Sequence, residues 1–556
     1  MPYYKKVLNK KNKLILFGGL LIPLFVFLNR FLIPDVSFDS INYHIFSGDR
    51  FSSFWKFINV EFFSAGLHSF PPFFDYLGGI FRLIFGYRLG SICSLFFLYG
   101  IIYLIYKIVS IFIKKRISSS LLLVLFFINT FISLEFFFQL GTYYVDIIGA
   151  FFVLWALYYI ILYIKNNDIK FLYFGSFIIG LSVAGKLTNL IYLIPLTVML
   201  IVWEFKKRDC YRDKLKHLVI YALLVFIPIG ISCFENVVKT GNPFFPFYNS
   251  VFKSKYYPAV NFDNTNFGGR NFFEKLLWPI FSVKNPARLS EGHDLFNDYK
   301  LNLYFVLLLP SLYFSYKLRR KDRLFYYLNL YLFGSFMVWN FSFGYLRYAF
   351  VLEILSGLIV LIWVSKLLKR RSSVNKDRLL LLLIPLLFLL GYLDKRAINV
   401  NLAYDLSWRK TLTYNRRDYL KEYKYFFINK LDSVGVDDIN KPDVYVNCSA
   451  PGLSFYSLSQ FNKLPVVEID TRSSGAMTLN SFYQDEVNRR ISNFYNNRKT
   501  IKFVTIVGSY GHINQMSDCL LNLSIRKYSV KKEIPVDNFL GYKGEKLIYI
   551  FGEYSL

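Results

Sequence analysis

Long blocks of apolar residues recur along the chain, separated by short polar gaps. Several blocks, such as 14–32 and 379–393, approach the roughly 20 residues that an α-helix needs to cross the hydrocarbon core of a bilayer. The pattern predicts a polytopic α-helical membrane protein with about eleven transmembrane helices, at residues 14–34, 88–113, 118–138, 142–164, 171–185, 187–203, 218–235, 301–316, 324–342, 347–365 and 379–394. The stretch through Gly185 and Lys186 fits either two short helices or a single tilted one.

Composition supports this class, since 54% of the residues are hydrophobic and 20% are aromatic. The net charge of +29 would by itself suggest a nucleic-acid partner. However, the basic residues gather in short gaps between the apolar blocks, at 114–116, 165–170, 206–216, 317–323 and 366–378. With the N-terminus in the cytoplasm, all of these gaps fall on the cytoplasmic side, as the positive-inside rule requires. We therefore expect membrane lipid, and no nucleic acid, as a partner.

This orientation leaves three long segments on the extracytoplasmic face, at about 35–87, about 236–300 and 396–556. The last of them contains the β-rich runs VYVNC, KFVTIVG and KLIYIFG, with helical patterns between them. We expect a transmembrane module over 1–395 and a small extracytoplasmic α/β domain over 396–556. The GSYGH run at 508 is no nucleotide-binding fingerprint, so no nucleotide cofactor is expected.

The first outer loop opens with PDVSFDSINYHIF, in which Asp35 and Asp39 are four residues apart. In a helix they share one face, and Asp39 lies one turn before Tyr43. The simplest interpretation is a helix cap, because carboxylates are favoured at helix N-termini. A catalytic interpretation depends on which other residues lie at the same end of the spans.

More charged residues occur at the outer ends of other spans: Glu135 and Asp146 in EFFFQLGTYYVDIIGAFF, Lys186 in GLSVAGKLTNL and Arg347 in FSFGYLRYAFVLEI. A charge within an apolar span is costly and usually faces a cavity or a partner. Simpler interpretations exist, since Lys186 can extend to the interface and Arg347 can mark a boundary. Taken together, these residues predict a cluster of acids and bases on one face of the membrane.

The motifs FDSINYH, HSFPPFF, GTYYVD, AGKLTN, TGNPFFPFY and GYLRY, in this order and on this side of the membrane, resemble those of GT-C integral-membrane glycosyltransferases. The resemblance is to the bacterial branch related to protein O-mannosyltransferases and the aminoarabinose transferase of lipid A, and it covers about residues 1–395. It implies a GT-C-like helix arrangement in the bacterial plasma (inner) membrane, with an outer C-terminal domain. The chain departs from the aminoarabinose transferases by lacking their adjacent Asp-Glu pair after the first span.

The resemblance implies a glycosyltransferase that takes a sugar from a polyprenyl phosphate and transfers it, with inversion, to a lipid, glycan or protein acceptor on the extracytoplasmic face. Asp39 is then the expected base for the acceptor hydroxyl. Arg347 suits the leaving phosphate as a bidentate partner, and Lys186 adds a point charge. Arg270, in NFGGR of the second outer loop, is a further expected anion contact. The other expected substrate-binding residues are Tyr43, His44, Asp146 and Tyr348.

The role of Asp146 stays open among three alternatives. It orients Lys186 or the acceptor, it raises the basicity of Asp39 by repulsion, or it binds a divalent metal together with Glu135. Metal sites made only of oxygen ligands leave little trace in a sequence, so metal dependence is left unknown.

Two other classes are considered. A polysaccharide polymerase or ligase also handles polyprenyl-linked sugars, but it is not expected to carry a first-loop acid such as Asp39. A lipid or oligosaccharide transporter would use Asp146 and Lys186 as pathway residues, but would not need two long outer loops and an outer domain. The transferase is therefore the favoured interpretation.

Overall fold

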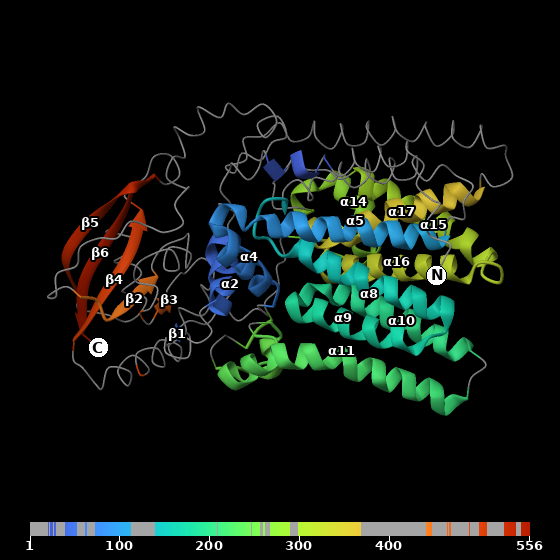
Figure 1. The fold of residues 1–556 in the computed structure, drawn as a ribbon, viewed down its shortest axis with the longest axis horizontal. Helices are drawn as coiled ribbons and strands as arrows, with labels where there is room; N and C mark the ends of the chain where they lie inside the picture. The colour runs from blue at the N-terminus through green and yellow to red at the C-terminus, as the bar shows by residue number, and fades with distance from the viewer. Residues whose placement is uncertain are drawn as a thin grey trace.

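The computed structural model describes residues 21, 23–25, 27–28, 39–52, 62–63, 73–112, 139–207, 210–245, 247–255, 259–261, 267–289, 299–367, 441–447, 464, 466–468, 489, 500–508, 528–540 and 546–555. A long bundle of helices has a β-sheet beyond one of its ends (Figure 1). Two helices, α2 (Ile45–Ser52) and α4 (Phe73–Leu89), lie between the bundle and the sheet (Figure 1).

The helices of the bundle coincide with the predicted spans. They are α5 (Ile92–Phe112), α8 (Asp146–Asn166), α9 (Ile169–Gly185), α10 (Leu190–Lys206), α11 (Tyr211–Thr240), α15 (Tyr299–Lys317), α16 (Arg323–Ser342) and α17 (Phe350–Leu367). Five segments within the described residues are long and apolar enough to cross a membrane: Ile92–Phe112, Asp146–Asn166, Leu187–Lys206, Tyr211–Val238 and Leu346–Trp363. The polytopic helical class is thus confirmed. The described residues include only part of the span predicted at 14–34 and none of the spans predicted at 118–138 and 379–394. The number of eleven transmembrane helices therefore stays a prediction.

The chain breaks between α9 and α10 and forms two helices there. α9 ends at Gly185, Lys186 has an extended backbone (φ −156°, ψ 109°), and the 3₁₀ turn η3 (Leu187–Asn189) leads into α10. The Asn189 amide donates to the carbonyl and the hydroxyl oxygens of Ser182, at 3.1 and 2.9 Å, which ties the turn to α9. A Cβ at Gly185 would lie 2.6 Å from the Phe74 ring, so α4 packs directly on this break.

A close crossing holds the start of the first outer loop against α4. The π-helical turn η1 (Ser40–His44) continues into α2, and α2 meets α4 at two glycines. A Cβ on Gly79 would lie 2.2 Å from the carbonyl oxygen of Gly48, so the backbones approach this closely only with glycine. Arg82 of α4 also donates to the carbonyl oxygen of Ile45 at 3.1 Å. These contacts fix η1, and with it Asp39, relative to the helix bundle.

The sheet has the strand order β1-β3-β2-β4-β6-β5. Its strands are β1 (Phe62–Phe63), β2 (Val444–Asn447), β3 (Val466–Glu468), β4 (Thr500–Gly508), β5 (Tyr528–Leu540) and β6 (Lys546–Ser555). Parallel pairs join β1, β3, β2 and β4, whereas β4, β6 and β5 pair antiparallel.

Three of these strands, β2, β4 and β6, coincide with runs that the sequence predicts, whereas β3 and β5 were not anticipated. β1 comes from the first outer loop and pairs with β3, so this loop contributes the edge of the tail's sheet. The helices predicted near residues 419–431 lie outside the described residues, and the domain division at 395 stays a prediction.

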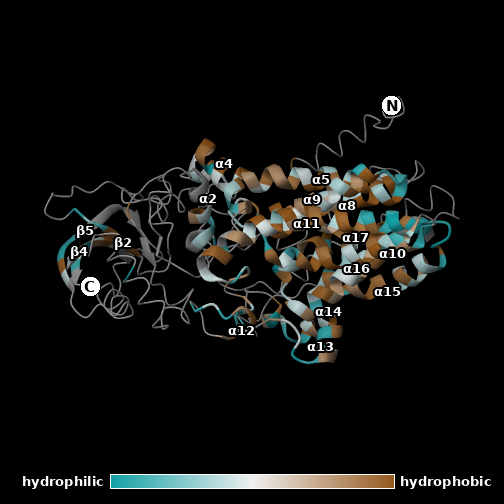
Figure 2. Ribbon diagram, turned by 90° about the horizontal axis from the view of Figure 1, so that it is seen from below, coloured by the Kyte–Doolittle hydropathy of each residue, from teal (hydrophilic) through white to brown (hydrophobic). Residues whose placement is uncertain are grey.

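Hydrophilic residues gather at the end of the bundle that points away from the sheet (Figure 2). The basic gaps 206–216 and 317–323 join α10 to α11 and α15 to α16 at this end (Figure 1). These two basic gaps and the sheet therefore lie at opposite ends of the bundle, which agrees with the predicted sidedness.

Candidate active site

Asp39 and Arg347 form a buried ion pair at the end of the bundle next to α2. Nη1 of Arg347 donates to Oδ2 of Asp39 at 2.6 Å. Only 8% of the Arg347 side chain and 14% of the Asp39 side chain are exposed. Asp39 occupies the N-cap position of η1, yet its side chain accepts no capping hydrogen bond. The carboxylate is therefore held by Arg347, and the helix-cap interpretation does not account for it.

The surroundings of Asp39 favour its charged form. Burial is the largest single influence and raises the pKa of this carboxyl, but the charges of Arg347 and His44 and the hydrogen bonds from Arg347 and Tyr43 together lower it by more. The net result is a pKa below the usual value of 3.8. Repulsion from Asp146, one of the alternatives considered for that residue, therefore does not set the basicity of Asp39 in this arrangement.

A second ion pair lies beside the first. Nζ of Lys186 donates to Oδ1 of Asp146, and Nε of Arg347 lies 3.9 Å from Oδ2 of Asp146. Asp146 begins α8, Lys186 lies at the break before η3, and Arg347 lies in the 3₁₀ turn η6 (Leu346–Ala349). Only 15% of the Lys186 side chain is exposed, so it does not extend to the interface as a snorkelling lysine does. The two acids and two bases form one charge-balanced group, which we call the four-charge cluster.

Aromatic rings surround the cations of this cluster. The guanidinium carbon of Arg347 lies 5.1, 5.4 and 5.6 Å from the ring centroids of Tyr144, Tyr345 and Tyr348. Nζ of Lys186 lies 5.0 Å from the centroid of Tyr348. The rings stabilise the cations through their π faces and exclude bulk water, which strengthens every charge interaction at this site.

The segment 344–348, which carries Arg347, is fixed by side chains from three other helices. Each of these side chains donates a hydrogen bond to a backbone carbonyl oxygen of the segment. The bonds are Tyr192 Oη of α10 to Tyr348 O (2.6 Å), Trp278 Nε1 of α14 (Trp278–Phe281) to Gly344 O (2.6 Å) and Trp339 Nε1 of α16 to Tyr345 O (2.8 Å). The position of the guanidinium is thus set by packing across the whole bundle.

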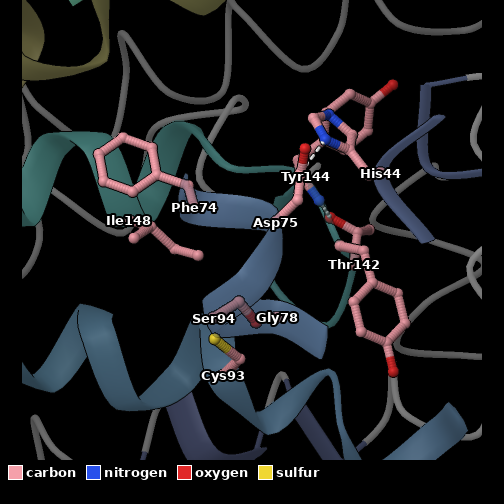
Figure 3. Close-up of a pocket in the computed structure, with 10 residues that line it drawn as sticks. His44, Phe74, Asp75, Gly78, Cys93, Ser94, Thr142, Tyr144 and Ile148 are labelled. Atoms are coloured by element: carbon pink, nitrogen blue, oxygen red, sulfur yellow. Dashed lines mark hydrogen bonds and ion pairs between the residues drawn. The ribbon is translucent and has the colours of Figure 1, made fainter. Parts of the chain in front are cut away.

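His44 and Asp75 form a further buried pair that the sequence analysis only half anticipated. Nδ1 of His44 lies 2.6 Å from Oδ1 of Asp75, and 6% of each side chain is exposed. Both line a pocket between the first outer loop, α4, α5 and the start of α8 (Figure 3). The sequence analysis did not select Asp75 as a site residue. The sequence does offer a signal for it, because Asp75 is a carboxylate in the first turn of the helix that follows Pro71 and Pro72.

Arg270 lies apart from the four-charge cluster. Its side chain is exposed, and its backbone N–H donates to Oε2 of Glu274 at 2.8 Å, just before α13 (Phe272–Leu276). Among the ion pairs of the described residues, none joins Arg270 to the cluster. Its anion contact stays a prediction.

No group of three or more His, Cys, Asp or Glu residues close enough to hold a metal ion occurs within the described ranges. Glu135, the partner considered for Asp146 in metal binding, lies outside them.

The described helices form a polytopic bundle with the four-charge cluster buried at one of its ends. Residues 69–231 match the family model described as dolichyl-phosphate-mannose-protein mannosyltransferase. A search of curated protein sequences finds no significant match.

Two solved structures are similar to nearly the whole chain. One is ArnT from Cupriavidus metallidurans bound to undecaprenyl phosphate, with 13% identity, a TM-score of 0.53 and coverage of 96% of this chain and 97% of that chain. The other is the apo state of ArnT from Cupriavidus metallidurans, with 12% identity, a TM-score of 0.52 and coverage of 97% and 98%. The predicted resemblance to GT-C proteins is confirmed, and the similarity establishes a shared fold.

Proposed function

We propose that this protein is a glycosyltransferase that moves a sugar from a polyprenyl-phosphate donor to a hydroxyl of a lipid, glycan or protein acceptor. The observation that carries the proposal is the four-charge cluster, in which a carboxylate and an anion-binding guanidinium are buried side by side at one end of a membrane bundle. The similar structure of ArnT from Cupriavidus metallidurans is bound to undecaprenyl phosphate, which supports a polyprenyl-phosphate partner for this protein. The site faces the extracytoplasmic side of a bacterial plasma membrane in this proposal, with the N-terminus in the cytoplasm.

The chemistry follows from the charges of the cluster. Asp39 accepts the proton of the acceptor hydroxyl while the acceptor oxygen bonds to the anomeric carbon. The bond from this carbon to the phosphate oxygen breaks, and polyprenyl phosphate leaves with the bonding electrons. Arg347 and Lys186 stabilise the negative charge that grows on the leaving phosphate. A single displacement inverts the anomeric centre.

Because Asp39 and Arg347 are paired in the empty site, binding of the donor also changes the basicity of Asp39. A donor phosphate competes with the Asp39 carboxylate for the Arg347 guanidinium, because both are oxyanions that accept from the same N–H groups. When Arg347 turns to the phosphate, Asp39 loses the partner that keeps its pKa low, so it becomes a stronger base. Asp39 is therefore activated only when a donor is present, which suppresses proton transfer in the empty site.

Asp146 has a positioning role in this scheme. Its two oxygens face Lys186 and Arg347, so it holds both phosphate-binding cations toward the same point. It also balances their charge when no phosphate is bound, because a buried unpaired cation is costly.

The test uses purified protein in lipid nanodiscs with a panel of radiolabelled polyprenyl-phosphate sugars. We expect the wild type to release or transfer sugar from at least one donor, and Asp39→Asn to lower this rate by about 10²- to 10⁴-fold. Asp168→Asn is the matched control, because Asp168 caps the start of α9, at the opposite end of this helix from Lys186, and asparagine caps equally well. Equal turnover in Asp39→Asn and the wild type would refute Asp39 as the base, and a lack of turnover with every donor would refute the transferase.

A further inference from the structure

Two polar atoms beside the four-charge cluster are left without a hydrogen bond. Within the described chain, His44 and Asp75 bond to each other through Nδ1 and Oδ1, while Nε2 of His44 and Oδ2 of Asp75 have no hydrogen-bond partner. The two side chains are 94% buried, as 6% of each is exposed, and both line the pocket of Figure 3. Neither atom is among the fully buried polar atoms without a partner, so both remain open to a ligand in this pocket.

Three other polar side chains of the pocket, Ser94, Thr142 and Tyr143, are already used by the fold. The Ser94 hydroxyl donates to Ser91 O at 2.7 Å and accepts from the backbone N–H of Gly141 at 2.9 Å. The Thr142 hydroxyl donates to Gln139 O at 2.7 Å and accepts from the backbone N–H of Tyr144 at 3.3 Å. The Tyr143 hydroxyl donates to the carbonyl oxygen of Tyr87. Unlike these three hydroxyls, His44 and Asp75 keep open hydrogen-bonding positions toward the pocket.

The pocket adjoins the proposed phosphate site through one shared ring. Tyr144 lines the pocket, its ring centroid is 6.1 Å from that of His44, and the guanidinium carbon of Arg347 is 5.1 Å from the same Tyr144 ring. On the other side, Tyr43 hydrogen-bonds Asp39 and its ring lies 4.2 Å from that of His44. The open atoms are thus one aromatic ring away from both the base and the phosphate ligand.

We propose that the His44–Asp75 pair binds hydroxyl groups of the donor sugar and determines which sugar the enzyme accepts. This proposal rests on the transferase function argued above. In the donor the sugar is bonded directly to the phosphate, so a polar wall next to the phosphate site meets the sugar ring. Oδ2 of Asp75 accepts from one sugar hydroxyl, and Nε2 of His44 bonds a second one. This pair favours a sugar with two neighbouring hydroxyls over one that places an apolar group there. An apolar group would leave Oδ2 of Asp75 or Nε2 of His44 without a hydrogen bond in the closed site, which is costly.

The experiment compares two lipids that differ only in the sugar. Binding of undecaprenyl phosphate, and of the undecaprenyl-phosphate sugar that the wild type uses best, is measured in nanodiscs for the wild type, Asp75→Asn and His44→Asn. In His44→Asn the side-chain amide reaches Asp75 in place of Nδ1 but has no group in place of Nε2, so it separates substrate binding from support of the fold. Asp168→Asn is again the matched carboxylate-to-amide control.

We expect both variants to bind undecaprenyl phosphate like the wild type and to bind the sugar-linked lipid about ten- to a hundredfold more weakly. The proposal is overturned if the variants bind both lipids more weakly by the same factor, since the pair then only supports the fold. It is also overturned if the variants keep the full preference for the sugar-linked lipid. It is also overturned if only the KM for the acceptor rises, because the pocket then holds the acceptor. A wild type that binds no sugar-linked lipid refutes the transferase itself, and that outcome is distinct from the others.

Discussion

Arg347 and Asp39 are 308 positions apart in the chain, yet Nη1 of one lies 2.6 Å from Oδ2 of the other. Each neutralises the other inside a site that is largely closed to water. In the proposed mechanism an incoming phosphate competes with Asp39 for the guanidinium, so the pair joins the proposed phosphate site to the proposed base. Substitutions at either end of this pair therefore have different expected effects on donor binding and on chemistry.

Arg347→Lys keeps the positive charge but removes the planar donor fork. We expect weaker binding of undecaprenyl phosphate by about tenfold and a fall in turnover by about 10²- to 10³-fold, because an ammonium cannot make the bidentate contact that stabilises the leaving phosphate. Radiolabelled donor turnover and lipid binding in nanodiscs measure the two effects. Wild-type turnover in Arg347→Lys would mean that charge alone suffices at this position and that the guanidinium geometry is not used.

The pH dependence of stability follows from the lowered pKa of Asp39. A carboxyl group whose pKa is lowered in the folded state stabilises the protein at pH values above its unfolded pKa, and this contribution is lost as the pH falls through the folded value. The pKa of Asp39 lies below 3.8, so the difference in apparent Tm between the wild type and Asp39→Asn is expected to stay constant from about pH 5 to 8. It shrinks only at more acidic pH. Thermal unfolding in detergent, followed by tryptophan fluorescence, checks this, and a difference that already shrinks between pH 7 and about 5 would contradict it.

Tyr192 is expected to act on the reaction by positioning Arg347. In Tyr192→Phe the carbonyl of Tyr348 loses its 2.6 Å hydrogen bond, so the turn that carries Arg347 is less firmly held. We expect about three- to tenfold weaker binding of undecaprenyl phosphate and a similar fall in kcat/KM. Tyr221→Phe is the matched control, because Tyr221 is equally buried in the bundle and its hydroxyl lies 2.7 Å from Thr197 Oγ1, away from the cluster. A positioning role is supported if both variants lose a similar amount of apparent Tm but only Tyr192→Phe loses lipid binding. Equal lipid binding in the two variants would exclude this role.

The sequence by itself determined the helices of the bundle and the basic gaps between them, because a membrane span needs a continuous apolar block and positive charges stay on one side. It also selected Asp39, Asp146, Lys186 and Arg347, since a charge at the end of an apolar block is conspicuous within a few residues of sequence.

Only the tertiary structure decided which of these charges face each other. The pairing of Asp39 with Arg347, the placement of β1 at the edge of the tail's sheet and the contact between His44 and Asp75 all join distant segments. Arg270 has the same local appearance as Arg347, an arginine beside glycine and aromatic residues, yet it lies exposed and apart from the cluster. Hydropathy and local spacing report how a segment is solvated, whereas contacts between segments depend on how helices pack, and packing is set by side-chain shapes that no single stretch of sequence contains.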